Sequence, residues 1–427
     1  MKLLTLAYYY PPQTSVGTLR TLRFMKAWVA NGHQADVICA DSPDRQFHPA
    51  GGLTDSGCAP GLTRFSVAPM NIKPAWQWPT RLIKGVRRLL GLRPIEDGRI
   101  ARHFWFIDLE WGWILPAYQQ ACECIRQSRP DAIYVSCPPF SAAVVGYLLK
   151  RRFGLPLVLD FRDGWGGSGY HGSQASHGWE QRLVSMADRL IVTSPSDQAY
   201  YQALSNTPVS LIYNGYDAPF DRPYLAHVGD PTLTLTYLGG WDGFRRSPEA
   251  LLRALKQCDF PWRLVSAGNT NQALVAWAST LGLSDQVLAQ GALPKGQLGP
   301  LLAQSDLLFI NKGQPEPGQR DTHVAAKILD YLACGKPILA ELPFGDSQEV
   351  LRQYAKSLTE VSAGKPDDYV AALKTLYQLK RRGELHGQAP DDEFLARFSP
   401  QYLGQQFCEV MTGQGLPLSE SLVVKAV

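Results

Sequence analysis

The stretch that decides the fold is 321-DTHVAAKILDYLACGKPILA-340, which predicts a helix followed at once by a buried strand. Thr322 can cap the first helical turn, and Gly335 stands where a left-handed residue often ends a helix. Lys327 and Asp330 are three residues apart, so they share one face near the helix start. Exposed backbone N–H groups and a lysine suit a diphosphate, and a carboxylate one turn later suits a ribose diol.

A second interpretation accounts for the same residues as an ordinary helix–strand unit with a solvated Lys–Asp pair. Ile328, Leu329 and Leu332 form the apolar stripe that either kind of helix would turn toward a core. The stretch therefore predicts an α/β fold, whereas nucleotide binding needs support from the rest of the chain.

Length and composition describe a globular protein of two ordinary domains. The chain has 427 residues, of which 45% are hydrophobic and 19% charged. Its net charge of +4 is too small to indicate a nucleic-acid partner. The eight cysteines show no CxxC or zinc spacing, which favours free thiols in a reducing compartment. Because we find neither a signal peptide nor eighteen consecutive apolar residues, we expect a cytoplasmic protein.

The chain opens with a predicted strand, a loop and a helix. A strand over residues 2–8 precedes a loop at its carboxyl end, where open α/β sheets bind ligands. The loop lacks GxGxxG, so the dinucleotide fingerprint is absent. Gly17 would let a ligand approach the backbone, with Ser15 and Arg20 beside it. A plain loop with solvated arginines at Arg20 and Arg23 is the alternative.

A second strand end carries unusual charges. The strand over residues 155–161 runs into Asp160-Phe161-Arg162-Asp163-Gly164-Trp165. Two carboxylates beside an arginine need partners if they are buried. A structural Asp–Arg pair explains one carboxylate, and the other, Asp163, is then a candidate active-site group.

The segment 81–90 predicts a basic amphipathic helix, with apolar residues on one face and Lys and Arg on the other. Such a helix either lies on an anionic membrane surface or covers its own domain. Residues 103–113 are dense in aromatics, for which core packing is the default and an acceptor pocket the minority interpretation.

The same strand–helix alternation occurs twice, on either side of a Pro- and Gly-rich joint at residues 218–231. We expect an α/β protein with two Rossmann-like domains, residues 1–217 and 232–395, facing across a cleft. A helix over 396–411 should pack back on the first domain, and 412–427 should form a tail. After the strand over residues 233–238, Gly240 precedes Arg245 and Arg246 at a helix start, which again suits an anion.

Two such halves resemble the GT-B fold of sugar-nucleotide-dependent glycosyltransferases. Residues 8–40 look like the N-terminal domain of glycosyltransferase family 4, and 327–340 look like its donor-binding helix and following strand. Segments 158–165, 187–194 and 213–217 are similar to bacterial members that build surface polysaccharides.

The resemblance implies a retaining, metal-independent transferase that uses no cofactor. It would move a sugar from a nucleoside-diphosphate donor to a saccharide or lipid-linked acceptor, in the cytoplasm or at the inner membrane surface. The alternatives are a catalytically silent sugar-nucleotide-binding scaffold subunit and a nucleotide-sugar epimerase on the same fold.

The family pattern also implies site residues. Two acids eight apart usually bracket the donor helix; Asp330 matches the second, which holds the ribose, and the first falls on Thr322. The usual active-site histidine is not evident on the 160–165 turn. Candidate donor-binding residues are Gly17, Gly240, Arg245, Arg246, Thr322, His323, Lys327 and Asp330, candidate catalytic residues are Asp163 and Arg162, and candidate acceptor-side residues are Ser15, Arg20 and Trp165.

Overall fold

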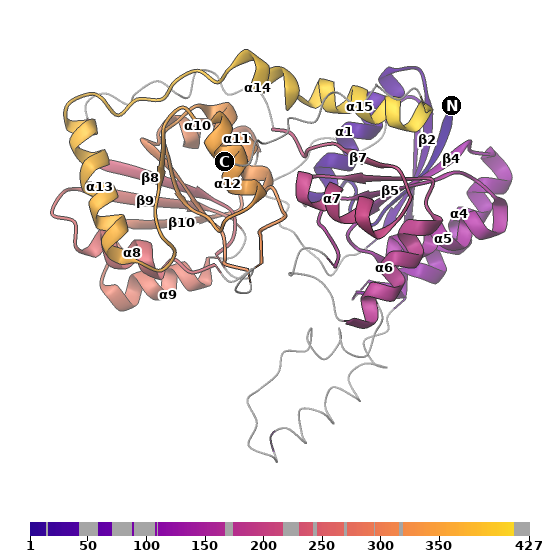
Figure 1. Ribbon diagram of the computed structural model, residues 1–427, viewed down its shortest axis with the longest axis horizontal. Coiled ribbons are helices and arrows are strands. Elements are labelled where there is room, and N and C mark those ends of the chain that lie inside the picture. The colour runs from indigo at the N-terminus through magenta and orange to yellow at the C-terminus, as the bar shows by residue number, and fades with distance from the viewer. Residues whose placement is uncertain are drawn as a thin grey trace.

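The computed structural model contains two parallel sheets, each with its own helices (Figure 1). It describes the whole chain except residues 14–15, 42–58, 71–87, 89–106, 109, 167–173, 217–229, 242–245, 269–270, 294, 316–318 and 414–427. Two Rossmann-like domains of α/β type were predicted, and the prediction is confirmed.

The first sheet has the strand order β3-β2-β1-β4-β5-β6-β7. Its strands are β1 (Lys2–Ala7), β2 (Gln34–Ala40), β3 (Leu62–Val67), β4 (Ala132–Cys137), β5 (Leu157–Phe161), β6 (Arg189–Val192) and β7 (Val209–Leu211). Its helices are α1 (Val16–Ala30), α4 (Ile114–Ser128), α5 (Ser141–Phe153), α6 (Gln174–Met186) and α7 (Pro195–Leu204), with a 3-10 turn at Trp111–Trp113.

The second sheet has the order β10-β9-β8-β11-β12-β13. Its strands are β8 (Leu233–Leu238), β9 (Trp262–Ala267), β10 (Val287–Gly291), β11 (Leu307–Asn311), β12 (Ile338–Glu341) and β13 (Leu358–Glu360). Its helices are α8 (Glu249–Lys256), α9 (Gln272–Leu281), α10 (Lys295–Ala303), α11 (Ala326–Cys334), α12 (Asp346–Tyr354) and α13 (Pro366–Arg381). Both orders reverse direction once, beside β1 and beside β8, and such switch points are where open α/β sheets bind ligands.

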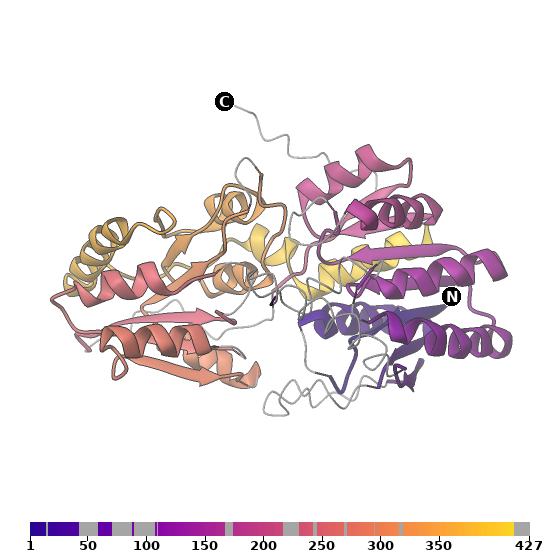
Figure 2. The ribbon, with the colours of Figure 1, turned by 90° about the horizontal axis from the view of Figure 1, so that it is seen from below.

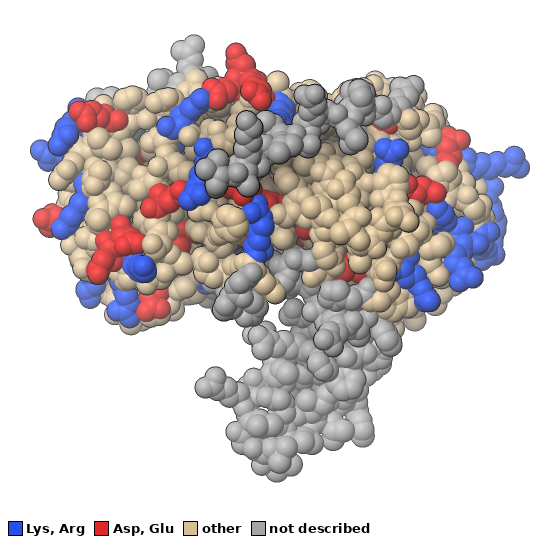
Figure 3. All heavy atoms as spheres, in the orientation of Figure 1, with Lys and Arg blue, Asp and Glu red and all other residues tan. Residues whose placement is uncertain are grey.

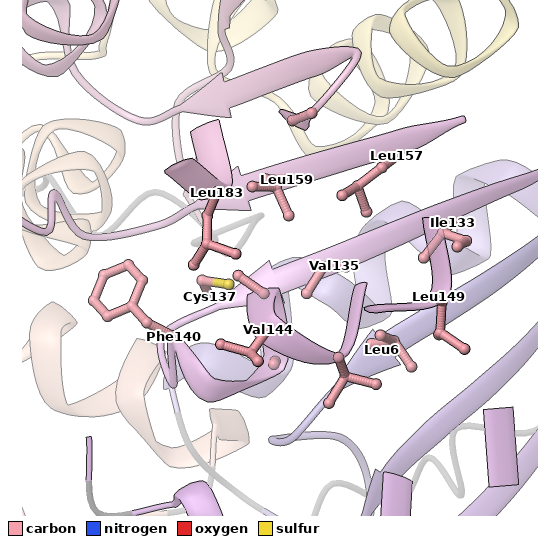
Figure 4. Packing of buried hydrophobic residues seen from close by; sticks show 14 of the residues in the cluster. Leu6, Ile133, Val135, Cys137, Phe140, Val144, Leu149, Leu157, Leu159 and Leu183 are labelled. Carbon is pink, nitrogen blue, oxygen red and sulfur yellow. The ribbon is translucent and has the colours of Figure 1, made fainter. Parts of the chain in front are cut away.

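Apolar strands explain why both sheets are covered on two faces. Every residue of β4 and β5 is buried, as expected of parallel strands between two helix layers. On one face, side chains of β1, β4 and β5 pack against α5 and α6, where Figure 4 shows Val135, Leu159 and Leu183 within one cluster. On the other face lie α1 and the C-terminal helix α15 (Pro400–Thr412).

The chain returns to the first sheet at its C-terminal end, through α14 (Asp392–Arg397) and then α15 (Figures 1 and 2). Phe407 of α15 stacks on Phe24 of α1, with ring centroids 4.6 Å apart. A Cβ on Gly404 would lie 2.5 Å from the Ala27 side chain, so only glycine lets the two helices approach this closely.

The expectation that Thr322 caps the helix of the opening stretch is wrong. The helix α11 begins at Ala326, because residues 321–325 are held by a neighbouring segment instead. Asp321 forms a bridge with Gly345, and its carbonyl accepts a hydrogen bond of 2.9 Å from the Asp346 N–H. The helix end was predicted correctly: Gly335 has φ 68°, and a Cβ there would meet the Gln388 carbonyl oxygen at 2.1 Å.

Several expectations fall outside the described residues: the basic helix over 81–90 apart from Arg88, the linker apart from its last two residues, the tail beyond Gly413, Ser15 and Arg245. Among the described residues, no helix combines the length and apolarity needed to span a bilayer. The seven described cysteines are free thiols, six of them buried.

Candidate functional site

The carboxyl ends of strands from the two sheets lie opposite one another. We call the boundary between the two halves, where Ser196 meets Asp346, the seam. Ser196 opens α7 beyond β6, and Asp346 opens α12 beyond β12. The Ser196 backbone N–H and hydroxyl donate to the two Asp346 carboxylate oxygens at 2.9 and 2.6 Å. Arg320 donates to Asp346 at 2.8 Å and to the Ser196 hydroxyl at 3.0 Å. The loops that bind ligands in each half therefore face one another.

At this seam His323, just before α11, meets Asp163, just after β5. The imidazole Nε2 lies 2.9 Å from Asp163 Oδ1, and the two side chains are 25% and 38% exposed. Behind the imidazole, Lys312 Nζ lies 3.3 Å from His323 Nδ1 and 2.6 Å from both oxygens of Asp321. Burial lowers the pKa of Lys312 and Asp321 opposes that effect. The bidentate carboxylate thus stabilises a buried ammonium.

A buried carboxylate, Asp197 of α7, adjoins this pair. Its side chain is 1% exposed, and neither oxygen has a hydrogen-bond partner of normal geometry among the described residues. The Thr322 hydroxyl is buried and unpartnered in the same sense. Burial, with a smaller effect of Asp346, raises the pKa of Asp197 to about 6, against the influence of His323. The Ser194 and Thr322 hydroxyls also oppose this rise, so both hydroxyls lie beside the Asp197 carboxylate at the seam.

Three cations gather at the carboxyl ends of β8 and β11. Lys327 Nζ donates to the Leu238 carbonyl at 2.9 Å and lies 3.9 Å from the centre of the Tyr237 ring. Burial lowers the pKa of Lys327 well below its ordinary value, and Arg246 and Lys312 lower it further. Arg246 donates to the Gly240 carbonyl at 3.1 Å. Partly desolvated cations that repel one another favour a bound anion.

Three candidate residues of the first sheet have structural partners. Arg162 is buried, and its guanidinium donates to the carbonyls of Cys137 and Pro138. A Cβ on Gly17 would lie 1.8 Å from Arg162 Nη1, so this glycine makes room for the guanidinium. Trp165 is 1% exposed and stacks on Phe140 at 4.3 Å, so its ring belongs to the core.

The predicted structural Asp–Arg pair exists, but Arg20 supplies the arginine. Arg20 Nε lies 2.9 Å from Asp160, and the two side chains are 3% and 0% exposed. The expectation of solvated arginines is therefore wrong for Arg20, because Asp160 provides the partner that burial requires. Asp330 of α11 lies near Arg23 of α1, where it opposes the lowering of the Arg23 pKa by burial.

Sequence reasoning missed Lys312, Ser196, Asp197, Arg320 and Asp346. Lys312 directly follows β11, so the strand-end rule applied elsewhere could have found it. The signal for Asp197 was the Ser194-Pro195 helix start, since the Ser194 side chain caps the Asp197 N–H. Nothing local in the sequence indicated that these residues meet across two sheets.

Comparisons with known proteins agree with this arrangement. Residues 17–215 match the family model described as glycosyl transferase 4-like domain, and residues 243–388 match glycosyl transferases group 1. A search of curated protein sequences found no match.

Similar solved structures cover almost the whole chain. Anabaena Alr3699/HepE in complex with UDP and glucose has a TM-score of 0.67 at 17% identity, over 97% of this chain and 100% of that one. HepE in complex with UDP-glucose has a TM-score of 0.66 at 18% identity, over the same shares of both chains. Sucrose-phosphate synthase from Thermosynechococcus elongatus has a TM-score of 0.67 at 15% identity, over 97% and 98%. At these identities the likeness shows a shared GT-B fold.

Proposed function

The chain belongs to glycosyltransferase family 4, and from that premise we propose that it is a retaining, metal-independent transferase. It moves a sugar from a nucleoside-diphosphate sugar to a saccharide or lipid-linked acceptor during synthesis of a polysaccharide or cell-surface glycan. The observation that carries the proposal is the grouping of Arg246, Lys312 and Lys327 where β8 and β11 end.

These cations suit the departing diphosphate. Breaking a sugar–diphosphate bond builds negative charge on the phosphate that leaves. Cations that bind this charge more strongly in the transition state than in the ground state lower the barrier. Lys312 is held by Asp321 and cannot move far, so it offers a preorganised charge. Gly240, whose carbonyl accepts from Arg246, and Arg245, which precedes Arg246 in the sequence, complete the proposed donor loop.

The rest of the donor lies along α11 in this proposal. The Asp330 carboxylate accepts from both ribose hydroxyls, and the backbone around Thr322 and His323 faces the sugar and phosphates. Gly17 faces this donor from the first sheet. The UDP and UDP-glucose complexes of HepE support a UDP-sugar as the first donor to test.

Asp163 is the proposed catalytic group that orients or deprotonates the acceptor hydroxyl. It is the more exposed carboxylate of its turn, since Asp160 is fully buried. Arg162 acts with it by bracing the turn against Cys137 and Pro138. Ser15, Arg20 and Trp165 form or support the acceptor side, Trp165 by holding the turn from the core.

The proposed location is the cytoplasm, with the inner membrane face as a docking surface. Free buried thiols fit a reducing compartment. Figure 3 shows Lys and Arg side chains gathered at the end of the molecule where Figure 1 places α4 and α5. Exposed cations there include Arg126, Arg129, Arg151 and Arg152, which would favour an anionic surface.

A panel of nucleotide-sugars tests the function. The purified protein should show its largest thermal shift with one nucleoside-diphosphate sugar, and it should transfer that sugar to an acceptor with retention of the anomeric configuration. Arg246→Ala should reduce the shift, while Arg151→Ala at the far end of the molecule should not. The proposal fails if no nucleotide-sugar changes the melting temperature, or if the product is inverted.

A further inference from the structure

The surroundings of His323 favour one of the two places for the proton of its ring. Lys312 Nζ lies 3.3 Å from Nδ1, and an ammonium can only donate. The three ammonium protons have closer acceptors in the Asp321 carboxylate and the His323 carbonyl, and a proton on Nδ1 would point at this positive charge and be repelled. The ring is therefore assigned with Nδ1 bare and the proton on Nε2. The partner of Nε2 is Asp163 Oδ1 at 2.9 Å, and a carboxylate accepts such a proton. Lys312 thereby sets the direction of the cross-seam hydrogen bond.

The backbone of His323 is fixed as well as its ring. Its carbonyl accepts hydrogen bonds from Lys312 Nζ at 2.5 Å and from the Ser347 hydroxyl at 2.6 Å. Its N–H lies 3.3 Å from the Asp321 carboxylate. These bonds fix the backbone that carries the imidazole. A fixed backbone is needed if the ring is to hold the Asp163 carboxylate in one orientation.

We propose that His323 is a positioning residue, whose Nε2–H holds the Asp163 carboxylate in the orientation that receives the acceptor hydroxyl. The inference rests on the proposed function, which assigns Asp163 to the acceptor. A carboxylate offers about four acceptor sites, and the bond from Nε2–H occupies one of them.

This arrangement couples catalysis to closure of the seam. Asp163 belongs to the first sheet and His323 to the second, so the bond exists only while the two halves are together. Asp163 is therefore oriented only when Ser196, Arg320 and Asp346 also hold the seam closed. An open enzyme would leave Asp163 loosely placed, which limits hydrolysis of the donor by water.

Nitrogen-15 NMR of the full-length protein, labelled at its eight histidines, tests the tautomer directly. The His323 signal is the one that disappears in His323→Gln. We expect the proton on Nε2 and a bare Nδ1, and we expect Asp163→Ala to shift the Nε2 proton signal. A proton on Nδ1, or a signal unchanged by Asp163→Ala, overturns the proposal.

Two substitutions of His323 give a kinetic test with UDP-glucose as the probe. The glutamine amide reaches about as far as Nε2, whereas the asparagine amide reaches only as far as Nδ1. His323→Gln should therefore have a kcat at least about tenfold above that of His323→Asn, with similar KM, since misplacement by 1 Å can cost 100-fold. Equal kcat values contradict the proposal. Failure of the wild type to bind UDP would count against the proposed function, and the NMR result would still decide the role of His323.

Discussion

Ser196 of the first sheet and Asp346 of the second form two hydrogen bonds across the seam, at 2.9 and 2.6 Å. The bonds join the starts of α7 and α12, so a carboxylate accepts from the N-terminal end of a helix in the other half. Because hydrogen bonds to charged groups contribute about 1.5–3 kcal/mol, this pair stabilises the closed arrangement.

Removing the Ser196 hydroxyl should open the seam. Ser196→Ala keeps the backbone bond and loses the bonds of the hydroxyl with Asp346 and Arg320, so the ratio of closed to open molecules should fall at least about tenfold. Small-angle scattering would report this as a larger radius of gyration without nucleotide. Ser128→Ala on α4, whose hydroxyl donates to the Cys124 carbonyl one turn earlier in the same helix, is the matched control. An unchanged radius in Ser196→Ala would show that the hydroxyl does not hold the halves together.

Asp163→Asn should reduce turnover by about 10²–10⁴-fold while UDP binding stays near the wild-type value. In the proposed mechanism the amide cannot take a proton from the acceptor, whereas the cations proposed to bind the donor lie beside the other sheet. Initial rates and calorimetry with UDP separate these effects. Wild-type turnover in the folded variant would remove Asp163 from the mechanism.

Asp197 should make stability depend on pH. Its pKa rises from 3.8 to about 6 on folding, so between these values the folded state binds more protons than the unfolded state. Stability attributable to this group is therefore highest below about pH 4 and falls as the pH rises through 6. Above that, the buried charge costs up to about 3 kcal/mol.

The variant Asp197→Asn removes that cost. It should melt at a higher temperature than wild type at pH 8, and the difference should shrink toward pH 4. Melting curves at several pH values measure this difference. Asp188→Asn is the control, because Asp188 is half-exposed and paired with Lys150, and this variant keeps the buried carboxylate of Asp197. If the difference in melting temperature between Asp197→Asn and wild type does not vary with pH, Asp197 does not have a raised pKa.

Arg20 should be needed for folding stability. Arg20→Met leaves Asp160 buried with Tyr134 as a neutral donor, and breaking a buried pair in this way costs about 3–5 kcal/mol. The double variant Arg20→Met/Asp160→Asn removes the stranded charge and should recover part of the loss. Thermal or urea unfolding measures both. Equal stability of the single variant and wild type would show that the pair contributes little.

If α11 binds the donor as proposed, Lys327 and Asp330 should contribute separately to ligand affinity. Lys327→Ala should weaken UDP more than uridine, because the proposed ligand partner of Lys327 is the phosphate. Asp330→Ala should weaken both about ten- to hundredfold, because charge-assisted bonds to the ribose are lost. Calorimetry with the two ligands distinguishes these patterns, with Lys374→Ala on the exposed face of α13 as the control. Wild-type UDP affinity in both variants would place the nucleotide elsewhere.

The fold was predictable because its signals are local. Apolar runs such as β4 and β11 must be buried on both faces, and their alternation with helices predicts parallel sheets. Gly335 ends α11 as expected, since its conformation depends on neighbours in the chain. The start of the same helix was missed because Asp321 pairs with Gly345, a contact that no local rule indicates.

The site was less predictable for the same reason. Lys327 and Asp330 could be proposed from their spacing within one helix. The contacts of Asp163 with His323 and of Ser196 with Asp346 join residues 150 or more positions apart. Strand-end rules place such groups at an edge of each sheet, but only the approach of the two sheets brings them together.

We expect the nucleotide to bind where β8 and β11 end. A crystal structure with UDP tests it most directly. We predict the diphosphate within hydrogen-bond distance of Arg246, Lys312 or Lys327, and the ribose hydroxyls on Asp330. A nucleotide bound against the first sheet, with these three cations contacting only protein, would contradict the account.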